Sequence, residues 1–397
     1  MNNSRRNLIS IAIAIFAFLS AAVFAQSKFT VIDKIGGDDH IPPNVNYLLL
    51  NAEGTVLTGQ AGSICGGVVA WKCRLFLWRF GDSTAWLDID KGVKSPIPIG
   101  INDDGSVIVG NFYRNGNKIA PFILKNGEVM AIKTVPGKES TNNDKLEMAA
   151  PGMVMGYSSE RGIAIIASTD ISGDDAAIIW RLSGNSALLP GKSGRGYLPV
   201  AISRDGNTIY GAAAERVNSG TRYSPVVWRS GGNPEEILSL KEFNNDGARI
   251  VVTSNDGKFF AGVTAGFSPE KGPWTKAYRW SIDGGHIFLG SVEDEKYGAG
   301  GVTIRAMSAD GRVIVGNQNY QYIDSRIKPA KVYSLPIVWR EGKGMTALEA
   351  ILREQGSLEE GYHITNVQAI SASGKVIAGL GLRMGESRET IWIAHLD

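Results

Sequence analysis

The sequence has almost no excess of charge of either sign. Lysine and arginine number 41 and aspartate and glutamate 39 among 397 residues. Both surplus charges, Arg5 and Arg6, lie in an N-terminal segment that we expect to be removed, which leaves 39 of each sign. This balance excludes a generally polybasic protein that binds nucleic acid or anionic membranes, although a local charged patch stays open. We predict no nucleic-acid partner.

Cysteine and histidine are also scarce, with two and four residues. Cys65 and Cys73 bracket a hairpin-sized loop, and in an oxidising compartment we expect them to form a disulfide. A zinc site needs more ligands than this segment offers, and the four histidines lie far apart and match no paired-histidine motif. We therefore predict no metal, no cofactor and no catalytic residue, while a site assembled from several repeats stays open.

Long apolar runs are missing except at the N-terminus. Residues 8–24 are apolar apart from two serines, follow Arg5 and Arg6, and lead to small residues at Val23 and Ala25. This order is that of a secretory signal peptide, so we predict cleavage after residue 25 and no membrane span after it. The alternative is an uncleaved anchor, since about 17 apolar residues are near the lower limit for crossing a bilayer. A secreted or periplasmic location follows, with cell-surface attachment left open.

Glycine, by contrast, is abundant: it makes up 49 of 397 residues, against a usual ~7%. Many glycines belong to a turn that opens with Ser or Asn, ends in Gly and precedes an apolar strand. The seven copies of this turn lie at 51–54, 102–105, 159–162, 203–206, 254–257, 308–311 and 371–374. Five residues after the turn glycine comes a second glycine, replaced in the third copy by Ala167. We attribute it to the close approach of another backbone, as between packed sheets.

A second motif, an apolar strand that bears a tryptophan, follows each turn. Its large residues are Trp78, Leu124, Trp180, Trp228, Trp280, Trp339 and Trp392. One such residue per unit suits packing between sheets. Each unit thus supplies a strand before the turn, one after it, the tryptophan strand and a weaker fourth strand. Four antiparallel strands repeated about every 50 residues are typical of a β-propeller blade.

The seven units predict an all-β fold, a seven-bladed β-propeller of four-stranded antiparallel blades in one domain, residues 26–397. The last unit contains only three strands, and residues 28–37 resemble a fourth. We expect this N-terminal strand to complete the last blade, because closure removes the open seam of a repeat array. Residues 346–356 place Leu348, Ile351 and Leu352 at helical spacing, and this helix is expected to cap the edge of the ring, with partner docking as the alternative.

The pattern A-I-S-x-D-G-x-x-I-x-G, followed by a Trp-Arg strand, resembles the HAF-repeat family of bacterial extracellular proteins, some of which carry an autotransporter barrel. The copies at 201–211, 306–316 and 369–379 match it best. The turns of the first and third copies depart from it, as does the strand of the second. The resemblance implies secretion or surface exposure, and it transfers no catalytic residues to this chain.

Function is expected on the connections between second and third strands, which are long and variable and should lie on one face. Variable loops on a rigid scaffold often bind partners, and these are rich in the residue types found at binding hot spots. The candidate binding residues are Trp71, Lys72, Tyr113, Arg114, Arg222, Tyr223, Trp274, Lys276, Tyr320, Tyr322, Arg326, Arg383 and Arg388. An ordinary solvated surface is the alternative.

These observations favour a monomeric, secreted, non-catalytic binding or scaffold module whose partner is a protein or a surface glycan. The alternative is a periplasmic hydrolase or lyase that acts on carbohydrate, with acidic residues converging at the centre of the ring. Such an enzyme needs two carboxylates about 5–10 Å apart. A binding module needs a broad face of tyrosine, tryptophan and arginine instead.

Overall fold

The computed structural model describes residues 28–63, 65, 73–87, 89, 94–113, 119–131, 153–171, 174–192, 195–217, 220–237, 249–268, 272–292, 301–322 and 331–397. The predicted signal peptide, residues 1–25, lies outside this part of the chain.

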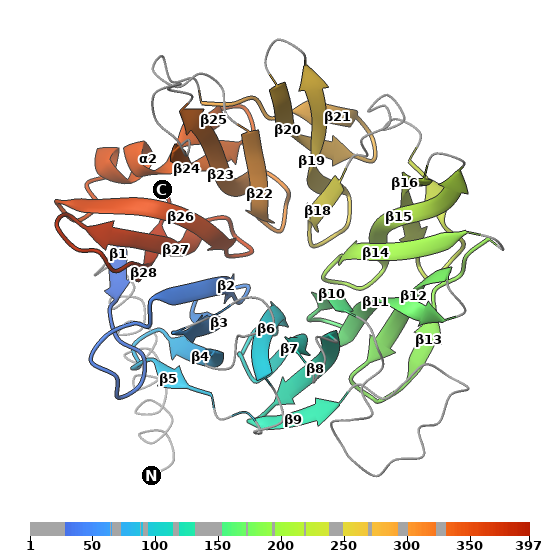
Figure 1. Cartoon of the computed structure of the whole chain (residues 1–397), viewed down its shortest axis with the longest axis horizontal. Helices are drawn as coiled ribbons and strands as arrows, with labels where there is room; N and C mark the ends of the chain where they lie inside the picture. The colour runs from blue at the N-terminus through green and yellow to red at the C-terminus, as the bar shows by residue number, and fades with distance from the viewer. Residues whose placement is uncertain are drawn as a thin grey trace, which may run out of the picture.

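Seven four-stranded antiparallel sheets surround a central axis (Figure 1), which confirms the predicted propeller. In blades 1 to 7 the innermost strands are β2 (Asn44–Leu50), β6 (Lys94–Ile101), β10 (Met153–Ser158), β14 (Gly196–Ile202), β18 (Arg249–Thr253), β22 (Gly301–Met307) and β26 (Tyr362–Ile370). The second strands are β3 (Val56–Gly62), β7 (Val107–Tyr113), β11 (Ile163–Ile171), β15 (Thr208–Val217), β19 (Phe259–Ser268), β23 (Val313–Tyr322) and β27 (Val376–Arg383).

The outer half of each blade holds the tryptophan strand and a short edge strand. The third strands are β4 (Cys73–Arg79), β8 (Ile119–Lys125), β12 (Asp174–Arg181), β16 (Gly220–Arg229), β20 (Gly272–Ser281), β24 (Lys331–Arg340) and β28 (Thr390–His395). The fourth are β5 (Ala85–Trp86), β9 (Glu128–Ala131), β13 (Ser186–Leu188), β17 (Glu235–Glu236), β21 (Gly285–Phe288), β25 (Gly344–Ala347) and, in blade 7, β1 (Phe29–Ile32).

The two ends of the chain close the ring. β1 pairs antiparallel with β28, so that Ile32 lies opposite Ile391. The N-terminal strand is therefore the fourth strand of blade 7, as predicted. Lys28 and Asp397 form an ion pair of 3.0 Å beside it, but both side chains are more than half exposed, and such pairs contribute little to stability.

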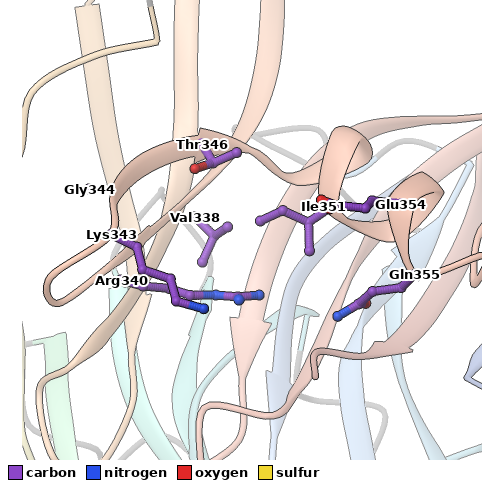
Figure 2. Close-up of a pocket in the computed structure, with 8 residues that line it drawn as sticks. All are labelled: Val338, Arg340, Lys343, Gly344, Thr346, Ile351, Glu354 and Gln355. Carbon is purple, nitrogen blue, oxygen red and sulfur yellow. The ribbon is translucent and has the colours of Figure 1, made fainter.

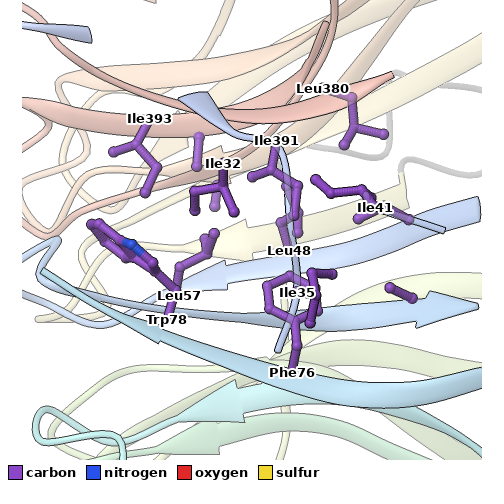
Figure 3. Packing of buried hydrophobic residues seen from close by; sticks show 14 of the residues in the cluster. Ile32, Ile35, Ile41, Leu48, Leu57, Phe76, Trp78, Leu380, Ile391 and Ile393 are labelled. Atoms are coloured by element: carbon purple, nitrogen blue, oxygen red, sulfur yellow. The ribbon is translucent and has the colours of Figure 1, made fainter. Parts of the chain in front are cut away.

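Apolar burial holds this closure together. Ile32 and Ile391 belong to one buried cluster with Leu48, Leu57 and Trp78 of blade 1 (Figure 3). Complete burial of an aliphatic side chain of this size contributes about 1.5–3 kcal/mol. Blades 7 and 1 are thus joined across an apolar interface, like the other neighbouring pairs.

The predicted row of tryptophans lies in the core between blades. All six, and Leu124 in the second blade, are at most 7% exposed, and each belongs to the cluster shared with the preceding blade. In blade 5, Trp280 stacks on Phe260 with 4.9 Å between ring centroids. Tyr210 of blade 4 lies edge-on to Trp280, with 6.3 Å between the centroids. These rings are packing residues, as the sequence analysis predicted.

The second glycine of the repeat faces a β-bulge in the first strand. Five copies share this arrangement, at Gly110, Gly211, Gly262, Gly316 and Gly379. A Cβ atom at any of them would lie 2.0–2.3 Å from a carbonyl oxygen of the first strand, which no side chain tolerates. A close backbone approach was predicted correctly, but the backbone belongs to the same sheet and not to a packed neighbour.

The third copy of the repeat is shifted by one residue from the predicted turn at 159–162. Its turn opens at Ser158, where the strand pairing ends. Consequently Ala164 lies opposite Trp180. An alignment of the copies on their turn glycines would place Ile165 there instead. The shift arises because this turn holds its glycine one place later than the other copies, so an alignment on glycine moves the register by one.

The residues that open the turns bond to the turn backbone. In blades 4 to 6 the serine hydroxyl accepts a bond from the N–H five residues later and donates to the aspartate two residues later. In blade 2, hydrogen bonds from Ser106 hold the pKa of Asp104 below its usual 3.8. Turn geometry therefore accounts for these acidic residues.

The tight turns are linked to one another around the axis. Backbone N–H to carbonyl bonds of 2.8–3.0 Å join, in order, Arg204, Asn255, Ala309, Ala372 and Ala52. Arg204 also forms ion pairs with the carboxylates of Asp103 and Glu160, which extends the linkage to blades 2 and 3. We call these seven residues the turn ring, their end of the molecule the turn face, and the opposite end the loop face.

One helix occurs in the described part of the chain, α2 (Leu348–Glu354), within the predicted range 346–356. Leu348 and Leu352 are fully buried and pack with Val338 of blade 6 and Trp392 of blade 7. The helix therefore fills the outer side of the junction between these two blades, in the packing role that its apolar face predicted.

Truncation of Ile32 tests the closure. We expect Ile32→Ala to lower the free energy of unfolding by about 2–4 kcal/mol, because the side chain is buried against both terminal blades. Lys34→Ala, at an exposed position two residues later, is the matched control and should leave stability within about 0.5 kcal/mol. Equal urea midpoints for the two variants would show that β1 does not hold the ring.

Candidate functional site

The connections on the loop face are largely β-hairpins. The sequence analysis treated the connections between second and third strands as loops, two of them at 212–223 and 263–276. Both are strand in all of their described residues, with pairing that continues to Val217–Gly220 and Ser268–Gly272. The prediction of loops there was wrong. Backbone hydrogen bonds can prolong a pair of strands whatever the side chains are. In these segments apolar and polar residues do not alternate, and that alternation is the signal by which a sequence predicts a strand.

The structure spreads the thirteen candidate binding residues around the ring. Four lie outside the described residues: Trp71, Lys72, Arg114 and Arg326. Three lie on the hairpin strands β16, β20 and β23: Arg222, Trp274 and Tyr322. The other six belong to blades 2, 4, 5, 6 and 7: Tyr113, Tyr223, Lys276, Tyr320, Arg383 and Arg388.

These six residues differ in exposure. Tyr223 is 48% exposed, and the ammonium group of Lys276 lies 5.5 Å from the ring centroid of Phe288. Tyr320, in contrast, is only 3% exposed and donates its hydroxyl to the carbonyl oxygen of Val292 at 2.8 Å. The expectation that Tyr320 contributes to a binding surface was therefore wrong, because this hydrogen bond and its packing hold it inside.

Tyr113 and the two arginines of blade 7 complete the set. Tyr113 is half-buried at the end of β7. Arg383 donates from Nε to Glu359 at 3.1 Å, an ion pair that leaves it only partly exposed. Arg388 is exposed on the hairpin between β27 and β28.

Arg388 borders a pocket of about 420 Å³ on the loop face. Its other walls come from the connection between β1 and β2: Gly37, Asp38, Asp39, His40, Pro42 and Pro43. Sequence analysis found Arg388 but missed the opposite wall. That segment is rich in glycine, aspartate and proline, which are the residues of ordinary turns, so no signal in the sequence marked it as a pocket wall.

One carboxylate of this pocket is anchored. Asp38 accepts a bond from the indole N–H of Trp86 at 3.0 Å and lies 3.9 Å from Arg74, whose guanidinium covers the Trp86 ring at 3.9 Å. Asp39 and Arg388 are exposed on opposite walls. The pocket is thus lined by two carboxylates from one segment and by the guanidinium of Arg388 from the other.

The bulges place one residue from each blade at the inner edge of the ring. These residues are Tyr47, Ile99, Met155, Val200, Val251, Arg305 and Gln368. Those of blades 2 to 5 are apolar and half-buried, whereas Arg305 of blade 6 is exposed and Tyr47 of blade 1 is 49% exposed. Solvent therefore reaches the innermost strands, and one side of the axis is more polar than the other.

The charge at this inner edge is uniformly positive. None of the seven innermost strands contains aspartate or glutamate, and three carry a basic residue: Lys94, Arg249 and Arg305. Lys94 and Arg249 begin their strands at the loop face, and Arg305 lies at its bulge. These strands therefore suit a ligand with negative charge, and they lack the carboxylates that an acidic catalytic centre requires.

Metal binding, membrane insertion and disulfide formation can be assessed for the same residues. Among the described residues, no three His, Cys, Asp or Glu side chains gather closely enough to hold a metal ion. No helix within these ranges has the length and apolar character needed to cross a membrane. Cys65 and Cys73 are joined in a disulfide, with 5.5 Å between their Cα atoms, which confirms the predicted pairing.

Comparison with known proteins identifies the fold only. No protein-family model and no curated protein sequence matches the chain. Among solved structures, the β-propeller domain of the Trilobed protease from Pyrococcus furiosus has a TM-score of 0.52 and 9% identity, over 89% of this chain and 95% of that one. That domain is described as having an open velcro topology, whereas here β1 pairs with β28.

Two further structures are similar at low identity. A prolyl endopeptidase has a TM-score of 0.52 and 10% identity, over 89% of this chain and 50% of that one. TolB from Acinetobacter baumannii has a TM-score of 0.39 and 12% identity, over 82% and 76%. At such identities the likeness concerns the propeller fold and carries no activity over.

Removal of the disulfide should lower the free energy of unfolding by little more than the entropy of closing its loop. Replacing both Cys65 and Cys73 by serine opens a loop with a sequence separation of 8 and is expected to lower the free energy of unfolding by at most about 2–3 kcal/mol. Urea denaturation measures the change. The wild-type protein with added reductant should unfold at the same midpoint as the double variant, and a larger loss in either would show that the bond supports more than its own hairpin.

Proposed function

We propose that the protein is a secreted, non-catalytic binding module that holds an anionic partner, a protein segment or a surface glycan, over the inner end of the loop face. One observation carries this proposal. The innermost strands contain no carboxylate and present Lys94, Arg249 and Arg305 instead. Basic groups of this kind attract a negatively charged partner, and fixed strands hold them without reorganisation.

The surrounding surface supports a broad contact. Tyr223 and Lys276 are exposed on the loop-face hairpins, and Arg388 borders the pocket beside Asp39. Tyrosine and arginine are enriched among residues that dominate binding energy. The alternative, a carbohydrate hydrolase or lyase with an acidic centre, receives no such support from the innermost strands.

The compartment is part of the same proposal. The N-terminal 25 residues have the order of a signal peptide, and a disulfide between Cys65 and Cys73 persists in an oxidising environment. The resemblance of the repeats to HAF-repeat extracellular proteins points the same way, and membership of that family is included in the proposal.

Binding to charged polymers tests the partner. We expect the protein to bind dextran sulfate or polyglutamate and not neutral dextran, with affinity that falls as salt rises. Arg249→Gln and Arg305→Gln should each weaken binding about tenfold, or ~1.4 kcal/mol. Lys375→Gln, an exposed lysine next to a turn of the turn face, is the control and should change nothing. Equal binding of dextran, or an equal loss in the control, would contradict the proposal.

Intact mass spectrometry tests the compartment. Expressed in bacteria from its own first residue, the protein should accumulate in the periplasm or medium as a chain that begins at Gln26. Its mass should be two hydrogens lower than that of the reduced form, because the two thiols are oxidised. A full-length chain with free thiols in the cytosol would refute this part of the proposal.

A further inference from the structure

A pocket of about 380 Å³ lies on the outer rim of the ring, between blade 6 and helix α2 (Figure 2). Arg340, at the end of β24, and Lys343, in the turn that follows, form one wall. Glu354 and Gln355, at the C-terminal end of α2, form the other. The turn at 341–343 joins a third strand to a fourth, so this pocket lies toward the turn face, away from the surface proposed above.

Two polar atoms of these walls are buried without a partner. Nη2 of Arg340 and Oε1 of Gln355 are shielded from solvent, and neither has a hydrogen bond within the described ranges. The other terminal nitrogen of Arg340 donates a long bond of 3.4 Å to a main-chain oxygen of Asp397. A buried polar atom without a partner costs about 1–3 kcal/mol. Because both atoms are shielded from water, a ligand in the pocket satisfies them only when the two side chains turn toward it.

The two walls require different groups from a ligand. The basic wall of Arg340 and Lys343 suits a carboxylate, which accepts charge-assisted hydrogen bonds. The oxygens of Glu354 and Gln355 accept hydrogen bonds from hydroxyl groups. Figure 2 shows Ile351 above and between these walls, where it supplies apolar surface for carbon atoms.

We propose that this pocket binds a sugar acid, with its carboxylate on Arg340 and Lys343 and its hydroxyls on Glu354 and Gln355. A sugar acid carries an anion, several donors and an apolar ring face in one compact body. A peptide terminus, in contrast, spreads its N–H donors along an extended chain. The pocket volume lies at the low end of the ~300–1,000 Å³ usual for small ligands. This site does not depend on the loop-face proposal.

Calorimetric titration of the purified protein with glucuronate tests the inference. We expect saturable binding that Arg340→Gln and Gln355→Leu each weaken at least fivefold. Lys343→Gln should weaken it similarly, and because Lys343 is exposed this variant removes a charge without disturbing the core. Lys258→Gln, an exposed lysine on another turn, is the matched control and should bind like the wild type. Arg305→Gln, at the inner edge of the ring, serves to detect any glucuronate that binds on the loop face.

Three further ligands distinguish a sugar-acid site from simpler kinds of binding site. Acetate tests for a plain anion site, glucose for a neutral sugar site and N-acetyl-dialanine for a peptide terminus. The proposal holds if glucuronate binds more tightly than all three and the pocket variants reduce that difference. It is overturned if glucuronate does not bind, if any of the three binds as tightly, or if Lys258→Gln weakens binding as much as Lys343→Gln. A loss on Arg305→Gln alone would assign glucuronate to the loop face instead.

Discussion

The pairing of β1 with β28 is the contact on which the ring depends. Without it, the sheet of blade 7 would end in an unpaired strand, and unpaired edges invite association with other chains. The pairing brings Ile32 and Ile391 into the same apolar cluster as Leu48 and Trp78 of the first blade. A strand from one end of the chain therefore gives the last blade the same kind of interface that every other blade has with its neighbour.

Closure of the ring also fixes which side chains lie near the axis. Each first strand carries a bulge, and a bulge adds one residue that the ladder of hydrogen bonds does not pair. In five blades a glycine on the second strand makes room for the carbonyl group beside the bulge. The added residue is placed at the inner edge, where Tyr47 and Arg305 are exposed. The added residues of blades 2 to 5 also pack against the apolar clusters between blades.

The two faces of the ring consequently have different roles. On the turn face, backbone hydrogen bonds and the ion pairs of Arg204 tie consecutive turns together. On the loop face, the strands continue as hairpins that bear exposed residues such as Tyr223 and Lys276. A fixed end with a variable end opposite it is the arrangement expected of a scaffold that presents a binding surface.

The seven blades, the order of their strands, the closing strand and the disulfide could all be predicted from the amino-acid sequence. Each rests on a local signal: turn glycines, alternating apolar residues, one tryptophan per unit, or two cysteines at short spacing. The register of the turn at Ser158, the length of the loop-face hairpins and the burial of Tyr320 could not be predicted in this way. Only the tertiary structure brought Arg340 and Gln355 to one pocket. These features depend on which distant segments meet, and no local pattern of residues encodes the distances between them.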